Sequence, residues 1–287
     1  MNDQSINSAQ NVFTRRELFN LGITTKTELK KLLANGGLTR IRRNSYATPI
    51  AHSSEVEAAQ LGVHLGCLSG CALRGLWTPP PAQTHLILEK HQAIPVSKTK
   101  QEHRHLVFHR MQEHYPTTVL PIDICLLQVA KFHDTETALI VFESAIDQGL
   151  ISFTEAKHLI TLLPAYKAKP MKYLDTAQSG SETRLRLFFQ RKRVKVRAQH
   201  MINGVGRVDL LVGKSLIVEA DSHTFHTKYE NYTSDRIRDL QATKLGFRVI
   251  RLSYAQIWHD WANTQSFLSD LIHSKIHMRP QRPIITP

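Results

Sequence analysis

The chain has 287 residues, which is enough for two domains that each bury a core. Lys and Arg number 37 against 24 Asp and Glu, and the formal net charge of +13 makes a polyanion such as nucleic acid the expected partner. No secretory signal and no unbroken apolar span is recognisable, so the composition excludes an ordinary membrane protein and predicts a soluble, cytoplasmic one.

Two short helices followed by a basic hairpin are predicted near the N-terminus. Two threonines, each with a glutamate three positions later, have capping-box spacing ahead of helical patterns: Thr14 with Glu17 and Thr25 with Glu28. The chain then turns at residues 35–37 and enters LTRIRRNSYATP, which is typical of a β-hairpin. This order suggests a winged helix, although a small helical module with a charged surface is the alternative. The expected DNA contacts are Lys26, Lys30, Lys31, Arg40, Arg42 and Arg43.

The same region resembles the N-terminal winged-helix domain of abortive-infection type IV antitoxins. The resemblance covers roughly residues 9–90 and depends on three segments, FTRRELFNLGIT, GGLTRIRRNSYATP and LSGCALRGLWTPPP. It implies DNA binding and transcriptional autoregulation. The C-terminal part of this chain differs from a typical antitoxin C-terminal domain, and this difference argues against antitoxin activity.

A middle segment of mixed strand and helix follows. Strands are predicted at residues 84–89 and 105–109, helices at 121–133, 136–147 and 153–162, and a linker at 164–181. Cys67 and Cys71 have the spacing of one helix face, which predicts buried structural thiols rather than a zinc site. The histidines at 103, 105 and 109 lie in alternating strand sequence and indicate no metal cluster.

The segment GRVDLLVGKSLIVEAD, residues 206–221, predicts a β-hairpin that carries three acids. A three-residue turn at 213–215 would pair Val212 with Leu216 and bring Asp209 opposite Glu219, about 5 Å apart at Cβ. A two-residue turn would spoil this alignment. Asp221 shares the same face because side chains alternate along a strand. Adjacent carboxylates repel each other unless a cation lies between them, and a hard ion such as Mg²⁺ or Mn²⁺ is the natural candidate.

Helices are predicted on both sides of this hairpin. Ser181 is the expected cap of the first helix, and Glu182 falls on its buried face with Leu185 and Phe189. The second helix is expected to start at Ser234 and to end at Gly246, before a strand at 247–253. Its inward residues should be Ile237, Leu240 and Leu245.

These residues and their order resemble the PD-(D/E)xK nuclease superfamily, and most closely the branch similar to very-short-patch-repair endonucleases. The resemblance covers about residues 179–258 and implies an αβββαβ core. It assigns Glu182 as the helix-borne acid, Asp209 as the central metal-binding aspartate and Glu219 as the acid of the E-x-K element. Asp221 stands where lysine is usual, which matches the E-x-D variant of that branch. Further matches are Asp235 and Arg238 as a D-x-x-R element, and His226, with His223 as the alternative, as the functional histidine.

Phosphodiester hydrolysis explains why such residues would gather. It needs a cation to offset phosphate charge, an activated water and a proton for the leaving oxygen. Asp209 and Glu219 would hold the metal, with Glu182 as an outer or direct ligand. Asp221 would orient water or the histidine, and His226 would act as acid or base. The simpler reading of each acid taken singly is a solvated strand end.

A run of basic residues precedes the hairpin. It suggests a groove wall that follows the phosphates, or only a solvated helix end. Its members are Arg184, Arg186, Arg191, Lys192, Arg193, Lys195, Arg197 and Arg207, and Arg191, Arg193 and Arg238 are the expected DNA contacts of this part.

The prediction is therefore a mixed α/β protein with a winged-helix domain at 9–90, a mixed segment at 91–165 and a restriction-endonuclease-like domain at 179–275. Its expected activity is Mg²⁺-dependent DNA cleavage, in defence against foreign DNA or in repair. A non-catalytic DNA-binding regulator of the antitoxin type and an RNA-directed nuclease are the alternatives. A homodimer, and a partner protein from a defence or toxin–antitoxin system, stay open.

Overall fold

The computed structural model describes residues 10–80, 83–94, 105–221 and 229–279, the last without the side chains of 229–236. The chain divides into two compact units, Met1–Lys172 and Tyr173–Pro287. The division falls within the predicted linker, and the middle segment belongs to the first unit. The linker is partly helical, because it contains α8 (Ala165–Ala168) and the 3-10 helix η1 (Lys169–Tyr173). In the described part of the chain, no helix is both long and apolar enough to cross a bilayer.

The first unit begins with the predicted helices and hairpin, preceded by a strand that the sequence did not predict. The elements are β1 (Val12–Thr14), α1 (Arg15–Asn20), α2 (Lys26–Ala34), β2 (Thr39–Arg42) and β3 (Ser45–Ala47). Both predicted capping boxes are confirmed. The three strands form an antiparallel sheet with β3 in the middle. Arg15 joins the two helices, since its guanidinium donates to the carbonyl oxygens of Ile23 and Thr24 at 2.6 and 3.1 Å.

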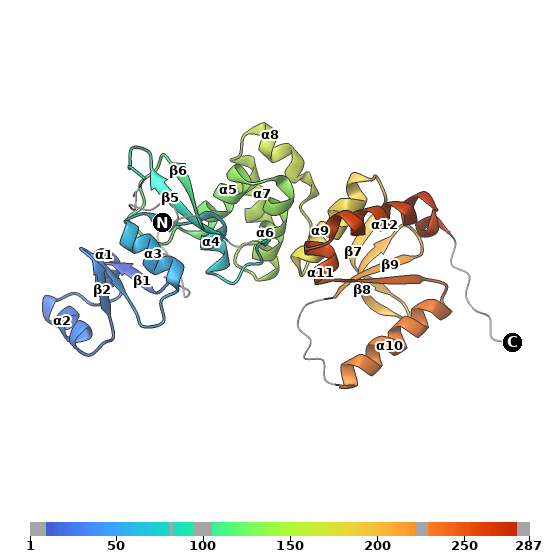
Figure 1. The fold of residues 1–287 in the computed structure, drawn as a ribbon, viewed down its shortest axis with the longest axis horizontal. Coiled ribbons are helices and arrows are strands. Elements are labelled where there is room, and N and C mark those ends of the chain that lie inside the picture. The colour runs from blue at the N-terminus through green and yellow to red at the C-terminus, as the bar shows by residue number, and fades with distance from the viewer. Residues whose placement is uncertain (1–9, 81–82, 95–104, 222–228, 280–287) are drawn as a thin grey trace. The chain divides into compact units, whose positions relative to one another are not determined.

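The rest of this unit combines a second small sheet with helices (Figure 1). Its elements are α3 (Ser53–Leu61), β4 (His64–Leu65), α4 (Cys67–Ala72), β5 (Thr84–Glu89), β6 (Leu106–Met111), α5 (Ile122–Phe132), α6 (Thr135–Asp147) and α7 (Phe153–Thr161). Strand β5 pairs antiparallel with β4 and parallel with β6. The predicted strands and helices of the middle segment are therefore confirmed to within a few residues.

The second unit is a four-stranded mixed sheet between helices. Its elements are α9 (Gly180–Arg191), β7 (Val196–Ile202), β8 (Gly206–Val212), β9 (Leu216–Asp221), α10 (Tyr229–Lys244), β10 (Arg248–Ser253), α11 (Tyr254–Trp258), α12 (Trp261–His273) and the 3-10 helix η2 (Ile276–Met278). The strand order is β10-β9-β8-β7, with only β9 and β10 parallel. Figure 1 shows α9 and α12 over one face of the sheet and α10 over the other.

The β8–β9 hairpin has the predicted three-residue turn, and Val212 pairs with Leu216. Gly213 has a positive φ of 63°, and an added Cβ there would collide with the main chain of His277. The same C-terminal segment binds the turn, because Lys214 N donates to the carbonyl oxygen of His277 at 2.7 Å. The turn is thus held from outside the hairpin as well as by its own residues.

Two details of the flanking helices differ from the predictions. The cap of α9 is Ser179, whose Oγ accepts from the main-chain N–H of Glu182, whereas Ser181 lies inside the helix and accepts from Trp258 Nε1. Helix α10 begins before Ser234. Ile237 and Leu240 are exposed, not inward. Among the side chains of α10 that the structure describes, Ala242 is the buried one, and at 100° per residue both Ile237 and Leu240 project away from it.

Candidate active site

Three acids of the second unit come from three elements and meet where β8 and β9 stop pairing. Glu182 lies in the first turn of α9, Asp209 in β8 and Glu219 in β9. The last pair of the β8–β9 ladder is Leu210 with Val218, and one more step in this register would place Asp209 opposite Glu219. The acids therefore occupy the end of an otherwise apolar hairpin.

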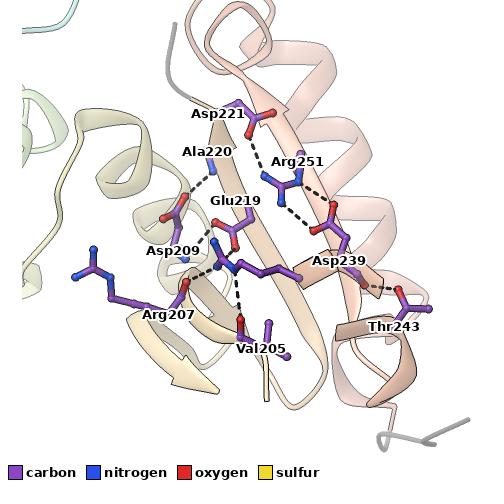
Figure 2. Close-up of polar contacts among 10 residues, drawn as sticks. Val205, Arg207, Asp209, Glu219, Ala220, Asp221, Asp239, Thr243 and Arg251 are labelled. Atoms are coloured by element: carbon purple, nitrogen blue, oxygen red, sulfur yellow. Dashed lines mark hydrogen bonds and ion pairs between the residues drawn. The ribbon is translucent and has the colours of Figure 1, made fainter. Parts of the chain in front are cut away.

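Asp209 and Glu219 interact directly through side-chain and main-chain atoms (Figure 2). Asp209 Oδ2 accepts from the main-chain N–H of Ala220 at 2.9 Å, and the N–H of Asp209 donates to Glu219 Oε2 at 3.4 Å. Carboxylate oxygens thus accept hydrogen bonds where a regular antiparallel ladder would use carbonyl oxygens. This exchange ties both acids to the sheet.

Strand β8 is irregular at Asp209. Leu210 and Val212 face the core under α9 and α12, whereas Val208 and Leu211 face the core under α10. Strict alternation would put Val208 with Leu210, so the strand changes phase at Asp209. The β7 residue opposite, Gln199, has a positive φ of 47°, and the β7–β8 ladder skips this pair. One residue on each strand leaves the ladder while the register on either side stays the same, so this is a local irregularity without an inserted residue, and it falls at the central acid.

Glu182 is buried, and its carboxylate accepts three hydrogen bonds. Ser179 Oγ donates to Oε1 at 3.0 Å, while Gln178 N and Gln199 Nε2 donate to Oε2 at 3.1 and 2.6 Å. Burial, followed by the charge of Asp209, raises the pKa of Glu182 despite these donors. Glu182 is therefore held firmly beside the pair of strand acids.

Glu219 has a strongly perturbed carboxyl group. Its side chain is only 12% exposed, and burial together with the neighbouring charge of Asp209 raises the pKa of Glu219 to about 8. Arg238 Nη2, at 3.9 Å from Glu219 Oε1, acts in the opposite direction but does not cancel this effect. Ionising all the acids in the absence of a cation would thus cost folding free energy.

Asp221 stands apart from these acids, with a side chain that is 45% exposed. It forms an ion pair with Arg251 of β10 at 3.5 Å, and Arg251 also binds Asp239 of α10 at 2.8 Å (Figure 2). The hydrogen bonds to Asp239 are the main cause of the raised pKa of Arg251. Burial acts in the opposite direction, and the charges of Asp221 and Glu219 add to the rise. The residue opposite Glu219 in the β9–β10 register is Arg251, so this cation lies beside the site as well.

Other predicted site residues are less directly placed. Arg238 donates to the carbonyl oxygens of Val205 and Arg207 at 3.3 and 2.6 Å, which fixes its guanidinium beside Glu219. Contact of Arg238 with DNA stays a prediction. His223, His226 and the side chain of Asp235 lie outside the described residues.

The predicted DNA-contacting cations are exposed, except for the half-buried Arg238. The exposed ones are Lys26, Lys30, Lys31, Arg40, Arg42, Arg43, Arg191 and Arg193. Two other members of the basic run are less exposed. The guanidinium of half-buried Arg184 lies 4.4 and 4.6 Å from the ring centroids of Trp258 and Trp261, and buried Arg186 donates to the carbonyl oxygen of Tyr173. For Arg186 the predicted groove wall is wrong, and for Arg184 it stays a prediction.

Sequence reasoning missed Gln199, Asp239 and Arg251. Gln199 belongs to no motif. It reaches Glu182 because it lies in β7, a strand that the sequence analysis did not predict. Arg251 carried no signal in the sequence either, because the register that pairs it with Glu219, and Ser253 with Asp221, is set by the sheet.

Comparisons with known proteins identify no family for this chain. No protein-family model matches it, and no curated protein matches it. The functional argument therefore depends on the geometry of the site.

Proposed function

We propose that this protein is a metal-dependent DNA endonuclease whose active site is built on Asp209 and Glu219, with Glu182 beside them. The observation that carries the proposal is the convergence of these acids, where burial and the charge of Asp209 both raise the pKa of Glu182 and of Glu219. A fold does not gather such groups for stability, and strongly perturbed carboxyl groups concentrate at functional sites.

The donor set fits Mg²⁺ or Mn²⁺, since all three residues offer hard carboxylate oxygens. Asp209 and Glu219 would hold the ion. Glu182, fixed by Gln199 and Ser179, would support it from the helix side. When bound, the ion would offset charge on the scissile phosphate and lower the pKa of a bound water. The positive charges of Arg238 and Arg251 lie beside Glu219 and offset part of the negative charge of the site.

DNA as the substrate is supported by charge. The formal net charge is +13, and exposed cations lie on α2 and on the β2–β3 hairpin of the first unit. A helix pair followed by a basic hairpin favours a winged helix that reads the major groove and touches the adjacent backbone. In this proposal the first unit binds DNA and the second cuts it.

A non-catalytic DNA-binding regulator is the rival, and the same basic helix and hairpin favour it. The acids separate the two functions. A regulator gains nothing from placing Glu182 and Glu219 beside the charge of Asp209, whereas a hydrolase needs such acids together.

The test is cleavage of supercoiled plasmid by the wild type in Mg²⁺, in Mn²⁺ and in EDTA, with a gel shift on the same DNA. Asp209→Asn and Glu219→Gln keep the side-chain shape and should lower the cleavage rate by about 100-fold or more, because a metal ligand is lost. Asp270→Asn, on the exposed side of α12, is the matched control and should cut like the wild type.

Both site variants should still shift the DNA. Tight binding by the wild type with no cleavage in either metal would favour the regulator. Equal cleavage by Asp209→Asn and the wild type would remove the proposed site.

A further inference from the structure

Four metal-ligating side chains converge in the first unit, whereas the acids of the proposed active site belong to the second. Their ligand atoms all lie within 4.8 Å of one another. They come from four places in the fold: the first residue of α4, strands β5 and β6, and the residue after α5. These residues are Cys67, His85, His109 and His133.

The contacts among the four have the scale of a coordination shell. Cys67 Sγ lies 3.2 Å from His133 Nε2, and His85 Nδ1 lies 3.0 Å from His109 Nε2. A tetrahedral zinc site with Zn–N of about 2.0–2.1 Å and Zn–S of about 2.3 Å has ligand-to-ligand edges of roughly 3.3–3.6 Å. The two contacts are slightly shorter than these edges, and no pair of ligand atoms is farther apart than 4.8 Å. Small side-chain movements would suffice to form the shell.

The four side chains are packed together in a largely covered place. Cys67 and His85 are buried, and His109 and His133 are half-buried. The ring centroid of His85 lies 5.3 Å from that of His109 and 5.0 Å from that of His133. The donor atoms therefore face one small space.

Neighbouring residues hold the ligands in place. Gln128 Oε1 accepts from the main-chain N–H of Cys67 at 2.9 Å, and Lys167 Nζ donates to the carbonyl oxygen of His133 at 2.7 Å. The ring of Phe132 stacks on His109 with centroids 4.2 Å apart. Cys67 also has a left-handed backbone, with φ of 49°, which is costly for a residue with a side chain. These contacts hold the backbone of Cys67 in this conformation, which directs its thiol toward the histidines.

We propose that Cys67, His85, His109 and His133 bind one Zn²⁺ ion in a closed structural site. One thiolate and three imidazoles are the soft and borderline donors that zinc takes, whereas Mg²⁺ prefers oxygen. Four protein ligands complete a tetrahedral shell and leave no position for substrate. The ion would join α4, β5, β6 and the end of α5.

The sequence indicated no metal cluster among its histidines, on the strength of His103, His105 and His109. Of these, His109 lies in a cluster that could hold a metal, His105 pairs with Glu57, and His103 lies outside the described residues. The ligands are separated by 18, 24 and 24 positions along the chain, so they lack the close pairs by which zinc sites are recognised in a sequence. Cys71 and Cys125 are buried elsewhere and are not members of the cluster.

The test is the metal content of the full chain, purified without a histidine tag and dialysed, together with its Co²⁺-substituted absorption spectrum. The wild type should hold about one zinc per chain, and Co²⁺ should give the intense visible bands of a tetrahedral site and a thiolate charge-transfer band. Cys67→Ser should lose the charge-transfer band, and His109→Gln should bind at least about 10-fold more weakly.

Three controls separate this site from others. Cys71→Ser removes a buried thiol from the same helix, His105→Gln removes a histidine just before β6, and Glu219→Gln alters the acidic site; all three should keep the zinc and the Co²⁺ spectrum. A variant that fails to fold leaves the wild-type readout intact. Wild-type protein without zinc after reconstitution, with copper in its place, or with an unchanged spectrum in Cys67→Ser would overturn the proposal.

Discussion

Glu219 shows how strongly one position can be shaped by its neighbours. Its carboxyl group sits in a mostly apolar hairpin, opposite the register position of Asp209 and beside Arg238. The simplest interpretation of the sequence is that an isolated acid at a strand end is solvated. Here the side chain is nearly covered, and the pKa of Glu219 rises to about 8 because burial and Asp209 both disfavour its charge.

This shift predicts how the stability of the second unit depends on pH in EDTA. Folded protein keeps the Glu219 proton to about pH 8, whereas the unfolded chain releases it near its ordinary value of 4.5. Between these values the folded state binds more protons, so the free energy of unfolding falls as pH rises. We expect Glu219→Gln to remove this fall and to stabilise the metal-free protein by on the order of 2 kcal/mol at about pH 8.

Urea denaturation of wild type and variant across this pH range is the measurement. Mg²⁺ should restore the free energy of unfolding of the wild type at high pH and leave that of the variant unchanged. A variant that is less stable than the wild type at high pH in EDTA would show that Glu219 stabilises the fold.

At the scale of elements, the helices and hairpins differ in how far their own residues determine them. The capping boxes of α1 and α2 and the three-residue turn of β8–β9 agree with the pattern of nearby residues, because caps and turns act over a few positions. The buried face of α10 does not follow its own apolar residues. Its contact is set by the sheet, which accepts Ala242 and leaves Leu240 exposed.

The β2–β3 hairpin and α2 carry a prediction for DNA binding. Combined replacement of Lys30, Arg40 and Arg43 by alanine should weaken binding and should reduce the salt slope of log K by about 0.9 for each phosphate contact that is lost. Gel shifts over a series of salt concentrations measure both effects. Lys157→Ala, an exposed cation on α7, is the control and should leave the slope unchanged. An unaltered slope in the triple variant would place the DNA elsewhere.

At the scale of the whole molecule, the chain has two compact units with separate cores. One set of core clusters lies within residues 12–119 and another within 185–268. The two proposed metal sites follow the same division, with the Cys and His ligands in the first unit and the acids in the second. Each ion should therefore act on one unit only.

If the two units unfold separately, scanning calorimetry should show two unfolding transitions. Removal of zinc with a chelator should lower the midpoint of one transition, and Cys67→Ser should lower the same one. Saturating Mg²⁺, at about 100 times its Kd, should stabilise the other by roughly 2.7 kcal/mol, because it binds only the folded state. A single transition that responds to both ions would contradict independent units.

The amino-acid sequence by itself determined the local features of this protein: the capped helices, the basic hairpin, the turn at 213–215 and the spacing of Asp209 and Glu219. These features depend on residues a few positions apart, so their patterns are visible in the chain. Only the tertiary structure decided that Gln199 binds Glu182, that Arg251 joins Asp221 to Asp239, and that Cys67 meets three distant histidines. Such contacts join distant segments, and they follow from strand register and helix packing, which no short pattern encodes.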